Sequence, residues 1–445
     1  MRRVVMWSTD PVGERMAGPG IRYHRLATEL AKRFDVTLVG PGREGVETAS
    51  YAYRPASGVR SAADLQAEVV VAQRLPLGLT RALHRRGVRL VYDLYVPSLI
   101  EGAAHLAGQG ERPEVARARY TELQAVQLLA LEVGDAFVCA SERQRDLWLG
   151  SLSALGRIDP ARYALDPSLR SLIDVVPFGL ELELEPTAAP ALRGVVDGIS
   201  ASDRLLLWGG GVWNWLDPLT VIEAVGRLSV LMPSLRLVFL GLGHPSAEVD
   251  TMSMAGRAVA LARQLGVEGS HVFFNQEWVP YDRRLDYFRE ADLGVSAHLD
   301  TAEGRFAYRT RMLDHFAAGT PVVTTSGDVL SELVAARGLG RVVAPGDVDG
   351  WVAAVRGLLE HPRELQEARS NVLTTREELA WERVAGPLAR LVDAAPAGPP
   401  GRQADAAVVR TAVTLLRSSL TRRGVDGTAR ALAGQVRRPP GERPD

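Results

Sequence analysis

The sequence predicts an α/β protein built from two Rossmann-like, doubly wound parallel-sheet domains that face each other across a cleft. Its 445 residues, of which 46% are hydrophobic, are too many for one ordinary core and suit two. Short apolar runs alternate with helical periods, as in parallel sheets that are covered on both faces. The alternation stops in one irregular stretch and then begins again, which predicts a second domain of the same kind.

The first predicted domain covers residues 1–180. Helical periods at about residues 21–33, 113–132 and 141–154 separate several of its expected strands. Those strands are the apolar runs RRVVMW, FDVTLVG, AEVVVAQ, VRLVYD and DAFVCA. Because the runs are short and nearly continuous in apolar residues, they are typical of strands buried on both faces of a sheet.

The second predicted domain covers residues 204–374, after a linker at 181–203 that shows neither strand nor helical period. Its helices include PLTVIEAVGRLSVLM and VDGWVAAVRGLLE. Its expected strands are RLLLW, LRLVFLG, HVFFN, DLGVSAH, TPVVTT and RVVAP. This order repeats the architecture of the first half, so both halves should bind ligands beyond the carboxyl ends of their strands.

The C-terminal region divides into a helix and a tail. Residues 375–394 predict a helix that packs back on the first domain, and residues 395–445 predict a flexible proline and glycine linker with a basic amphipathic tail. Three roles are open for that tail: docking on its own protein, contact with a partner, or lying on an anionic membrane. The favoured interpretation is a loose appendage.

Composition excludes several classes of function. A net charge of -1 and a pI near 6.7 give no support for a nucleic-acid groove, so the expected partner is small. Cys139, the only cysteine, lies in a predicted buried strand, and Lys32, the only lysine, lies on a helix far in sequence from any glycine turn, which disfavours Schiff-base chemistry. The apolar run near the N-terminus is too short for a signal peptide. These features predict a cytoplasmic protein, peripheral at the inner face of the membrane only if the tail binds there.

Two strand ends in the first half carry candidate binding residues. The turn STDPVGERMAGPGIRYH precedes a helix, and the end of VYDLYVP follows an apolar run. For the glycine turn before the helix, a tight loop with a helix cap is as good an explanation as a ligand site. For Asp93 at the end of VYDLYVP, a cap or turn residue is the more frequent explanation. The residues that would contact a ligand here are Gly18, Gly20, Arg22, Tyr23, Asp93 and Tyr95.

In the second half, the segment WGGGVWNW joins a predicted strand to a predicted helix. Gly209, Gly210 and Gly211 let backbone pass close to a bulky or charged ligand, while Trp213 and Trp215 provide flat walls or fill the domain surface. A dinucleotide-binding site is disfavoured, because no segment completes the three-glycine pattern and no acidic residue ends the next strand.

The segment ADLGVSAHLDTAEGRFAYRTRMLDHFAAGTPVVTT carries the strongest signal. It predicts a strand ending near His298, a polar loop and a helix at about residues 306–318. Arginines at the start of a helix suit a diphosphate, since they add forked donors to the free amides. The residues concerned are Glu303, Gly304, Arg305, Arg309, Arg311 and Asp314. A solvated surface pair of Arg311 with Asp314 and a loop charge at Glu303 form the alternative.

Most of residues 1–394 resembles the retaining glycosyltransferases of family 4, which have the two-domain GT-B fold. The specific part lies at about residues 286–325 and includes the run from Glu303 to AAGTPVV. Weaker matches are RLLLWGGG, VFLGLG, NQEWVPYD, VVPFGL and AGPGIRYHRLATELAKRFDVTLV. The resemblance implies that the second domain binds a nucleotide diphosphate sugar and the first binds a hydroxyl acceptor.

The resemblance also implies roles for individual residues. The family has two glutamates that lie eight positions apart. The second corresponds to Asp314, and the first falls on Phe306. Glu303 can take the place of the first glutamate only if the loop is three residues longer in this chain. The implied catalytic residues are Glu303, Asp93 and Arg309. The implied donor-binding residues are Gly210, Gly211, Trp213, Gly241, Gly243, Trp278, Val279, Gly304, Arg305, Phe306, Arg311 and Asp314, and the acceptor-binding residues are Gly18, Gly20, Arg22, Tyr23 and Tyr95.

Two departures from the family pattern leave other functions open. The arginine and lysine that usually follow the glycine turn are replaced by Trp213, Asn214, Trp215 and Asp217, and the histidine of the first domain is replaced by Asp93 and Tyr95. A catalytically inactive scaffold or an epimerase acting on nucleotide sugars therefore remains an alternative to transfer with retained configuration. No cofactor is expected, and the acidic pair Asp347 and Asp349 favours a helix cap over a metal site.

Overall fold

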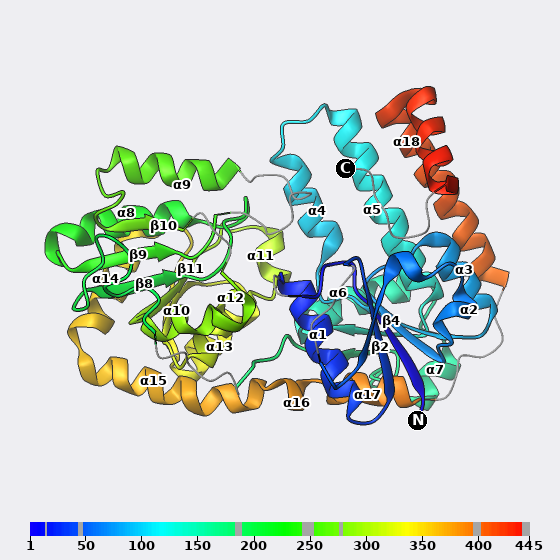
Figure 1. The fold of residues 1–445 in the computed structure, drawn as a ribbon, viewed down its shortest axis with the longest axis horizontal. Helices are drawn as coiled ribbons and strands as arrows, with labels where there is room; N and C mark the ends of the chain where they lie inside the picture. The colour runs from blue at the N-terminus through cyan, green and yellow to red at the C-terminus, as the bar shows by residue number, and fades with distance from the viewer. Residues whose placement is uncertain are drawn as a thin grey trace. The chain divides into compact units, whose positions relative to one another are not determined.

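The computed structural model describes residues 1–13, 16–42, 48–182, 189–242, 253–275, 279–394 and 402–437. The chain forms two compact units, each with its own parallel sheet. Unit 1 consists of Met1–Pro177 with Val384–Asp445, and unit 2 of Phe178–Arg383. Both units are α/β, as the alternation of apolar runs and helical periods predicts (Figure 1).

Unit 1 contains a seven-stranded parallel sheet in the order β3-β2-β1-β4-β5-β6-β7. The five expected strands are present, and two short strands extend the sheet at its edges. The strands are β1 Arg3–Trp7, β2 Asp35–Gly40, β3 Ala52–Pro55, β4 Val69–Ala72, β5 Arg89–Asp93, β6 Ala136–Cys139 and β7 Ile173–Val175. The order reverses between β1 and β4, which is where ligands bind in doubly wound sheets.

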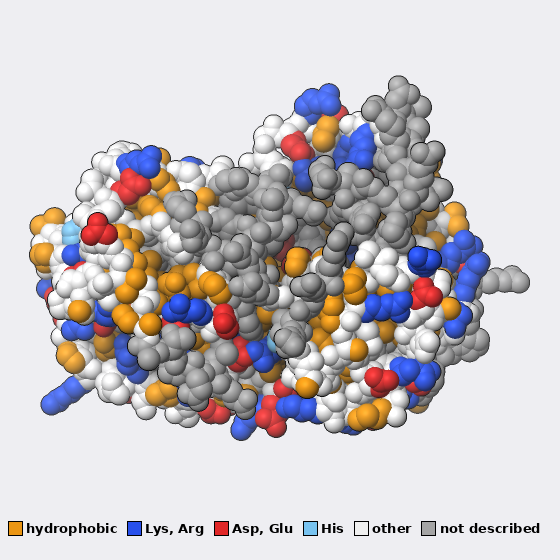
Figure 2. Space-filling view, in the orientation of Figure 1, with side chains coloured by type: hydrophobic (Ala, Val, Ile, Leu, Met, Phe, Trp, Pro, Cys, Tyr) orange, Lys and Arg blue, Asp and Glu red, His pale blue; other side chains and the backbone are white. Residues whose placement is uncertain are grey.

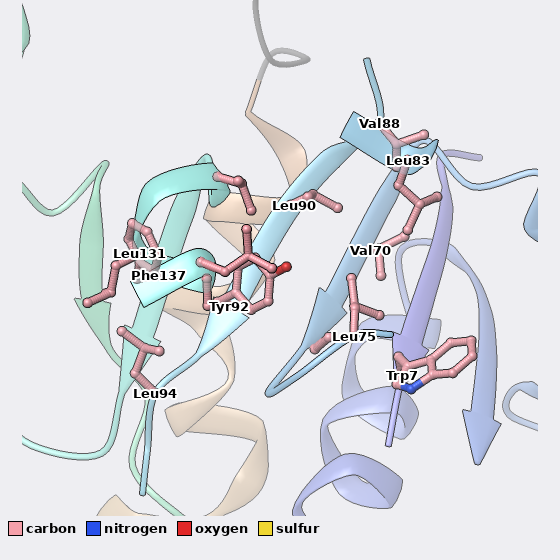
Figure 3. Packing of buried hydrophobic residues seen from close by; sticks show 14 of the residues in the cluster. Trp7, Val70, Leu75, Leu83, Val88, Leu90, Tyr92, Leu94, Leu131 and Phe137 are labelled. Carbon is pink, nitrogen blue, oxygen red and sulfur yellow. The ribbon is translucent and has the colours of Figure 1, made fainter. Parts of the chain in front are cut away.

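Helices cover the faces of this sheet and bury its apolar runs. The helices are α1 Gly18–Ala31, η1 Ala56–Gly58, α2 Ala62–Leu65, α3 Leu77–Arg85, α4 Ser98–Ala107, α5 Pro113–Val133, α6 Glu142–Ala154, α7 Pro160–Leu165, α17 Gly386–Asp393 and α18 Arg402–Arg437. Figure 3 shows one core cluster, in which Val70, Leu90 and Phe137 of the strands lie with Leu83 of α3 and Leu131 of α5. This burial on both faces explains why the strand sequences are nearly all apolar.

Unit 2 repeats the topology with a six-stranded parallel sheet in the order β10-β9-β8-β11-β12-β13. Its strands are β8 Arg204–Trp208, β9 Leu235–Phe239, β10 Val272–Phe274, β11 Leu293–Ser296, β12 Val322–Thr325 and β13 Gly340–Val343. Its helices are α8 Pro218–Leu231, α9 Ser253–Gln264, η2 Tyr281–Arg283, α10 Arg284–Glu290, α11 Ala302–Phe306, α12 Arg311–Ala317, α13 Val329–Arg337, α14 Val348–Glu360, α15 Pro362–Arg376, η3 Glu377–Leu379 and α16 Trp381–Val384. The sheet reverses its order between β8 and β11.

The linker was expected at residues 181–203. Its later part, residues 189–203, is described by the structure and belongs to unit 2. Glu290 at the end of α10 accepts hydrogen bonds from the backbone amides of Ala191, Leu192 and Arg193. Leu192 and Ile199 are buried in a core cluster with strand residues of unit 2. These residues form turns rather than a helix or strand, which is why no period marks them in the sequence.

The segment expected as one helix at 375–394 is divided into the end of α15, η3, α16 and α17, and its last part, from Val384, belongs to unit 1 together with α18. Arg2 of unit 1 donates hydrogen bonds to the carbonyls of Val392 and Ala394 at the end of α17, at 2.6 and 2.7 Å. The described part of the tail is not a loose appendage, because α18 packs along α5 (Figure 1). The expected proline and glycine linker at 395–401 lies outside the described residues.

Basic and acidic side chains are interspersed with hydrophobic ones over the face drawn in Figure 2, in keeping with the net charge of -1. Within the described ranges, no helix combines the length and apolar character that crossing a bilayer requires.

Candidate functional site

The glycine turn after β8 lies at the point where the sheet of unit 2 reverses its order. Gly209 has no space for a side chain, because a Cβ atom there would lie 2.6 Å from the ring of Phe288. Gly210 has a φ of +89°, which disfavours other residues. The carbonyl of Gly211 accepts a 2.9 Å hydrogen bond from Nη1 of Arg311, which ties the turn to the start of α12. The turn is therefore shaped by close packing and by this arginine.

Glu303 and Arg309 form a buried ion pair beside this turn. The two guanidinium nitrogens Nη1 and Nη2 of Arg309 donate to the two carboxylate oxygens of Glu303 at 3.0 and 2.7 Å. Both side chains are nearly inaccessible, at 5% and 3% exposure. The expected helix at 306–318 is wrong in detail, because it is broken into α11 and α12 and Arg309 lies in the break, where it folds back onto Glu303. Arg309 therefore already has a carboxylate partner.

Arg311 differs from Arg309 in its partners among the described residues. Within the part of the chain that the structure describes, no acidic oxygen lies within ion-pairing distance of its guanidinium, which is partly buried above the ring of Trp208 at 5.9 Å. Burial and the nearby charge of Arg309 lower the pKa of Arg311 to about 9, although Glu303 acts in the opposite direction. An anion bound here would stabilise the charged form of Arg311.

Asp314 pairs with an arginine that the sequence did not single out. Nε of Arg284 lies 3.1 Å from Oδ1 of Asp314, and Nη2 of the same arginine lies 3.1 Å from Oε2 of Glu181. The surface pair of Arg311 with Asp314, the alternative open in the sequence, is not formed. Arg284 and Glu181 were missed because they lie 30 and more than 100 positions away from their partners, where no helical period connects them.

The unusual residues after the glycine turn have structural partners. The carboxylate of Asp217 caps α8 by accepting from the backbone amide and hydroxyl of Thr220 at 3.2 and 2.6 Å. Oδ1 of Asn214 accepts from the amide of Met254 at the start of α9. The rings of Trp213 and Trp215 are parallel, with centroids 5.6 Å apart, and both pack against the core of unit 2. The contact of Trp213 with a donor stays a prediction.

His298 lies at the end of β11, behind the Glu303 loop. Its ring is buried and its Nδ1 lies 3.7 Å from Oδ2 of Asp328, which caps α13. Burial lowers the pKa of His298 to about 3, with a further contribution from the charge of Arg309, so the ring is neutral near pH 7. A side chain at Gly304 would lie within 3.1 Å of this ring. The neutral imidazole of His298 therefore packs against the loop at Gly304.

For the remaining candidate donor-binding residues, the structure gives only position and exposure. Gly241 follows β9 and has open space around its Cβ position, and Val279 is half-buried. Arg305 is exposed at the end of α11, and Phe306 is half-buried beside it. Gly243 and Trp278 lie outside the described residues.

The acidic pair near β13 has structural roles. Asp347 caps α14 by accepting from the amide of Gly350 at 2.8 Å, and Asp349 forms an ion pair with Arg227. Across the described ranges, no group of three histidine, cysteine or acidic residues is arranged to hold a metal ion.

In unit 1, the expected acceptor residues form a buried network. Nε and Nη2 of Arg22 donate to the carboxylate of Asp93 at 2.7 and 3.0 Å, and both side chains are 0% exposed. The same guanidinium donates to the carbonyls of Val176 and Pro177 and lies 4.7 Å from the ring centroid of Tyr95. The network ties α1 to β5 and to the chain after β7.

Arg22 and Tyr23 are buried within unit 1, and their contact with an acceptor stays a prediction. Helix α1 begins at Gly18, before the predicted start near residue 21, so both side chains lie inside the helix and face the core of unit 1. Burial raises the pKa of the Tyr23 hydroxyl well above its usual range. A Cβ atom at Gly20 would lie 2.3 Å from the carbonyl oxygen of Pro11, so this glycine allows a close backbone approach. The roles of Asp93 and Tyr95 in catalysis and binding stay predictions.

Comparisons with known proteins give a consistent result. Residues 203–361 match the family described as "Glycosyl transferases group 1". D-inositol 3-phosphate glycosyltransferase 2 of Catenulispora acidiphila is 26% identical over 307 residues, which is 68% of this chain and 65% of that protein, so the alignment spans less than two thirds of the relative.

Solved structures resemble the whole fold at low sequence identity. Sucrose-phosphate synthase from Thermosynechococcus elongatus has a TM-score of 0.61 at 15% identity, covering 88% of this chain and 98% of that one. HepE of Anabaena in complex with UDP and glucose has a TM-score of 0.57 at 13% identity, covering 88% of this chain and 99% of that one. These likenesses establish the fold, in which each unit carries a doubly wound parallel sheet.

Proposed function

Because the chain belongs to the family 4 glycosyltransferases of the GT-B type, we propose that it transfers a sugar from a nucleotide diphosphate sugar to a hydroxyl acceptor. The proposal includes retention of anomeric configuration and a hexose donor. It assigns no role to a metal or other cofactor. The complex of HepE with UDP and glucose supports a nucleotide sugar as the donor class.

Arg311 is the single observation that carries this proposal. Its guanidinium lies at the glycine turn after β8, lacks a nearby carboxylate among the described residues and has a lowered pKa. A buried cation without a counter-ion is unfavourable, and a diphosphate would supply the missing negative charge. Since Arg309 is already paired, Arg311 takes the role that the resemblance gives to the family's basic pair.

The proposed chemistry needs groups that stabilise the leaving diphosphate. As the bond between the sugar carbon and the phosphate oxygen breaks, positive charge grows on the carbon and negative charge grows on the oxygen. A cation fixed in place before the reaction lowers this barrier, because it requires no reorganisation. The acceptor hydroxyl attacks the same face of the sugar and gives its proton to the leaving phosphate, so no protein nucleophile is needed.

Thermal shift with a panel of nucleotide sugars tests the donor site. A true donor at about one hundred times its Kd should stabilise the protein by about 2.7 kcal/mol. We expect Arg311→Gln to abolish this stabilisation while the variant without ligand remains folded. Arg363→Gln, at an exposed position on α15, is the matched control and should keep the full shift. A shift that survives in Arg311→Gln would place the diphosphate elsewhere.

Release of free nucleoside diphosphate separates transfer from its alternatives. A transferase should release it with the true donor only when the acceptor is also present. Binding of the donor without turnover under any acceptor would favour the inactive scaffold. Conversion of the donor sugar without release of nucleoside diphosphate would favour an epimerase.

Arg284 should set the strength of ribose binding through Asp314, the counterpart of the family's second glutamate. Removing Arg284 leaves Asp314 without the guanidinium that orients it, so we expect Arg284→Gln to weaken UDP binding about tenfold, or about 1.4 kcal/mol. Calorimetry with UDP and with its 2′,3′-dideoxy analogue gives the measurement. The analogue should bind both proteins equally, because it lacks the hydroxyls that Asp314 would hold.

Arg283 offers a control for that experiment, because it is more exposed and pairs with Asp286 in its own helix region. Arg283→Gln should leave UDP binding unchanged. If Arg284→Gln weakened the binding of UDP and of the dideoxy analogue to the same extent, Arg284 would act on the fold of the site rather than on ribose.

A further inference from the structure

Helix α18 uses one of its faces to pack on unit 1. It runs antiparallel to α5, since Thr411 donates to the carbonyl of Ala125 and Ser418 donates to the carbonyl of Ala118. Arg410 and Arg422 extend this contact by pairing with glutamates of α5, Glu132 and Glu122, at 2.6 Å each. The packing fixes which side of α18 faces the solvent.

The opposite face of α18 carries an exposed apolar stripe. Val409, Val413, Leu416 and Leu420 are 55%, 42%, 44% and 39% exposed. Their spacing of four, three and four residues places them on one side of a helix. Single exposed apolar residues are ordinary, but four in line on one helix form a continuous surface.

The charges around this stripe have one sign. Arg410 and Arg417 follow Val409 and Leu416 directly and lie along one edge, and Arg423 lies on the other side. All three are exposed, and residues 406–424 contain no acidic side chain. Asp405, which directly precedes this range on the helix, pairs with arginines of α3. Arg410 already pairs with Glu132 of α5, so the outer face of α18 combines the apolar stripe mainly with Arg417 and Arg423.

We propose that this face of α18, residues 406–424, binds the surface of a membrane that contains anionic phospholipids. An amphipathic helix with arginines beside its apolar residues lies in the interface, with the apolar side chains among the upper acyl chains and the guanidinium groups at the phosphates. The net charge of the whole chain is -1, so the attraction is local to this helix and does not arise from the protein as a whole.

A second copy of the chain fits this face poorly. At about 1.5 Å per residue the face is about 28 Å long, and with a helix about 10 Å wide it offers roughly 300 Å². Stable protein interfaces bury about 800 Å² on each partner. Two such faces would also bring Arg417 and Arg423 of each copy together, and residues 406–424 of either copy supply no carboxylate.

Vesicle sedimentation with the full chain tests the proposal. We expect binding to vesicles made from equal parts of phosphatidylcholine and phosphatidylglycerol, and not to vesicles of phosphatidylcholine alone. High salt should weaken the binding, since it screens the arginines. Leu416→Asp and Arg417→Glu should each lower the partition coefficient about tenfold, because each puts negative charge at the lipid surface. Leu165→Asp on α7, where the native side chain is 89% exposed, is the matched control and should bind as the parent does.

Several results would overturn the proposal. These are failure to bind either vesicle, equal binding to both, or an equal loss in the Leu165→Asp control. A dimer in sedimentation equilibrium that Leu416→Asp dissociates would instead assign the face to a second copy. Circular dichroism and melting temperature show whether Leu416→Asp stays folded, and Arg417→Glu, which changes a solvent-exposed side chain, keeps the test valid if it does not.

Discussion

An Arg309→Ala variant is expected to lose about 3–5 kcal/mol of the free energy of unfolding of unit 2. The substitution leaves the carboxylate of Glu303 buried, at 3% exposure, without the guanidinium that neutralises it. Loss of the pair should also make the segment between α11 and α12 less ordered, because Arg309 lies in this segment and anchors it to Glu303. Urea unfolding followed by hydrogen exchange of the unit 2 strands gives the measurement, since it separates the two units.

Two further variants identify the cause of that loss. Glu303→Leu combined with Arg309→Met removes both charges, and the stability of unit 2 should recover most of the loss while transfer stays abolished. Arg337→Ala breaks an exposed pair with Glu378, whose side chains are about half accessible, and should cost about 1 kcal/mol or less. If Arg309→Ala cost no more than Arg337→Ala, the buried pair would contribute little to the fold.

The strands and most helices could be predicted because their signal is local. Strands such as β4 and β8 are short apolar runs that need no distant partner to be recognised. The edge strands β3 and β7 were missed because AYRP and IDV are short and carry polar residues or proline, as the edges of sheets allow. Their place in the sheet is decided by neighbours that lie far away in the sequence.

The sequence indicated which segments of unit 2 form the candidate site, but it did not indicate which of their charged side chains form ion pairs. The glycine turn and the run from Glu303 to Asp314 meet in unit 2, as expected from their positions at strand ends. Helical spacing suggested Arg311 as the partner of Asp314, whereas the partner is Arg284. A regular helix was assumed across Arg309, although the buried carboxylate six residues earlier interrupts it. Tertiary contacts overrode the local period in both cases.

Arg22→Met should be the second substitution with a large cost, about 3–5 kcal/mol of the free energy of unfolding of unit 1. It leaves Asp93 buried without its partner and removes the donors of the carbonyls of Val176 and Pro177. The amides of α1 and β5 should exchange faster, because this network joins them. Hydrogen exchange resolved by residue measures that change in the intact protein.

Asp93→Leu in the Arg22→Met background tests whether the network serves the fold or the acceptor. Removing both charges should restore most of the stability of unit 1, because two apolar side chains can fill the buried site without a charge to compensate. If transfer returned together with stability, Asp93 would have only a structural role. If stability returned and transfer did not, the reaction itself would need Arg22 or Asp93, the two residues to which the family resemblance gives roles at the acceptor.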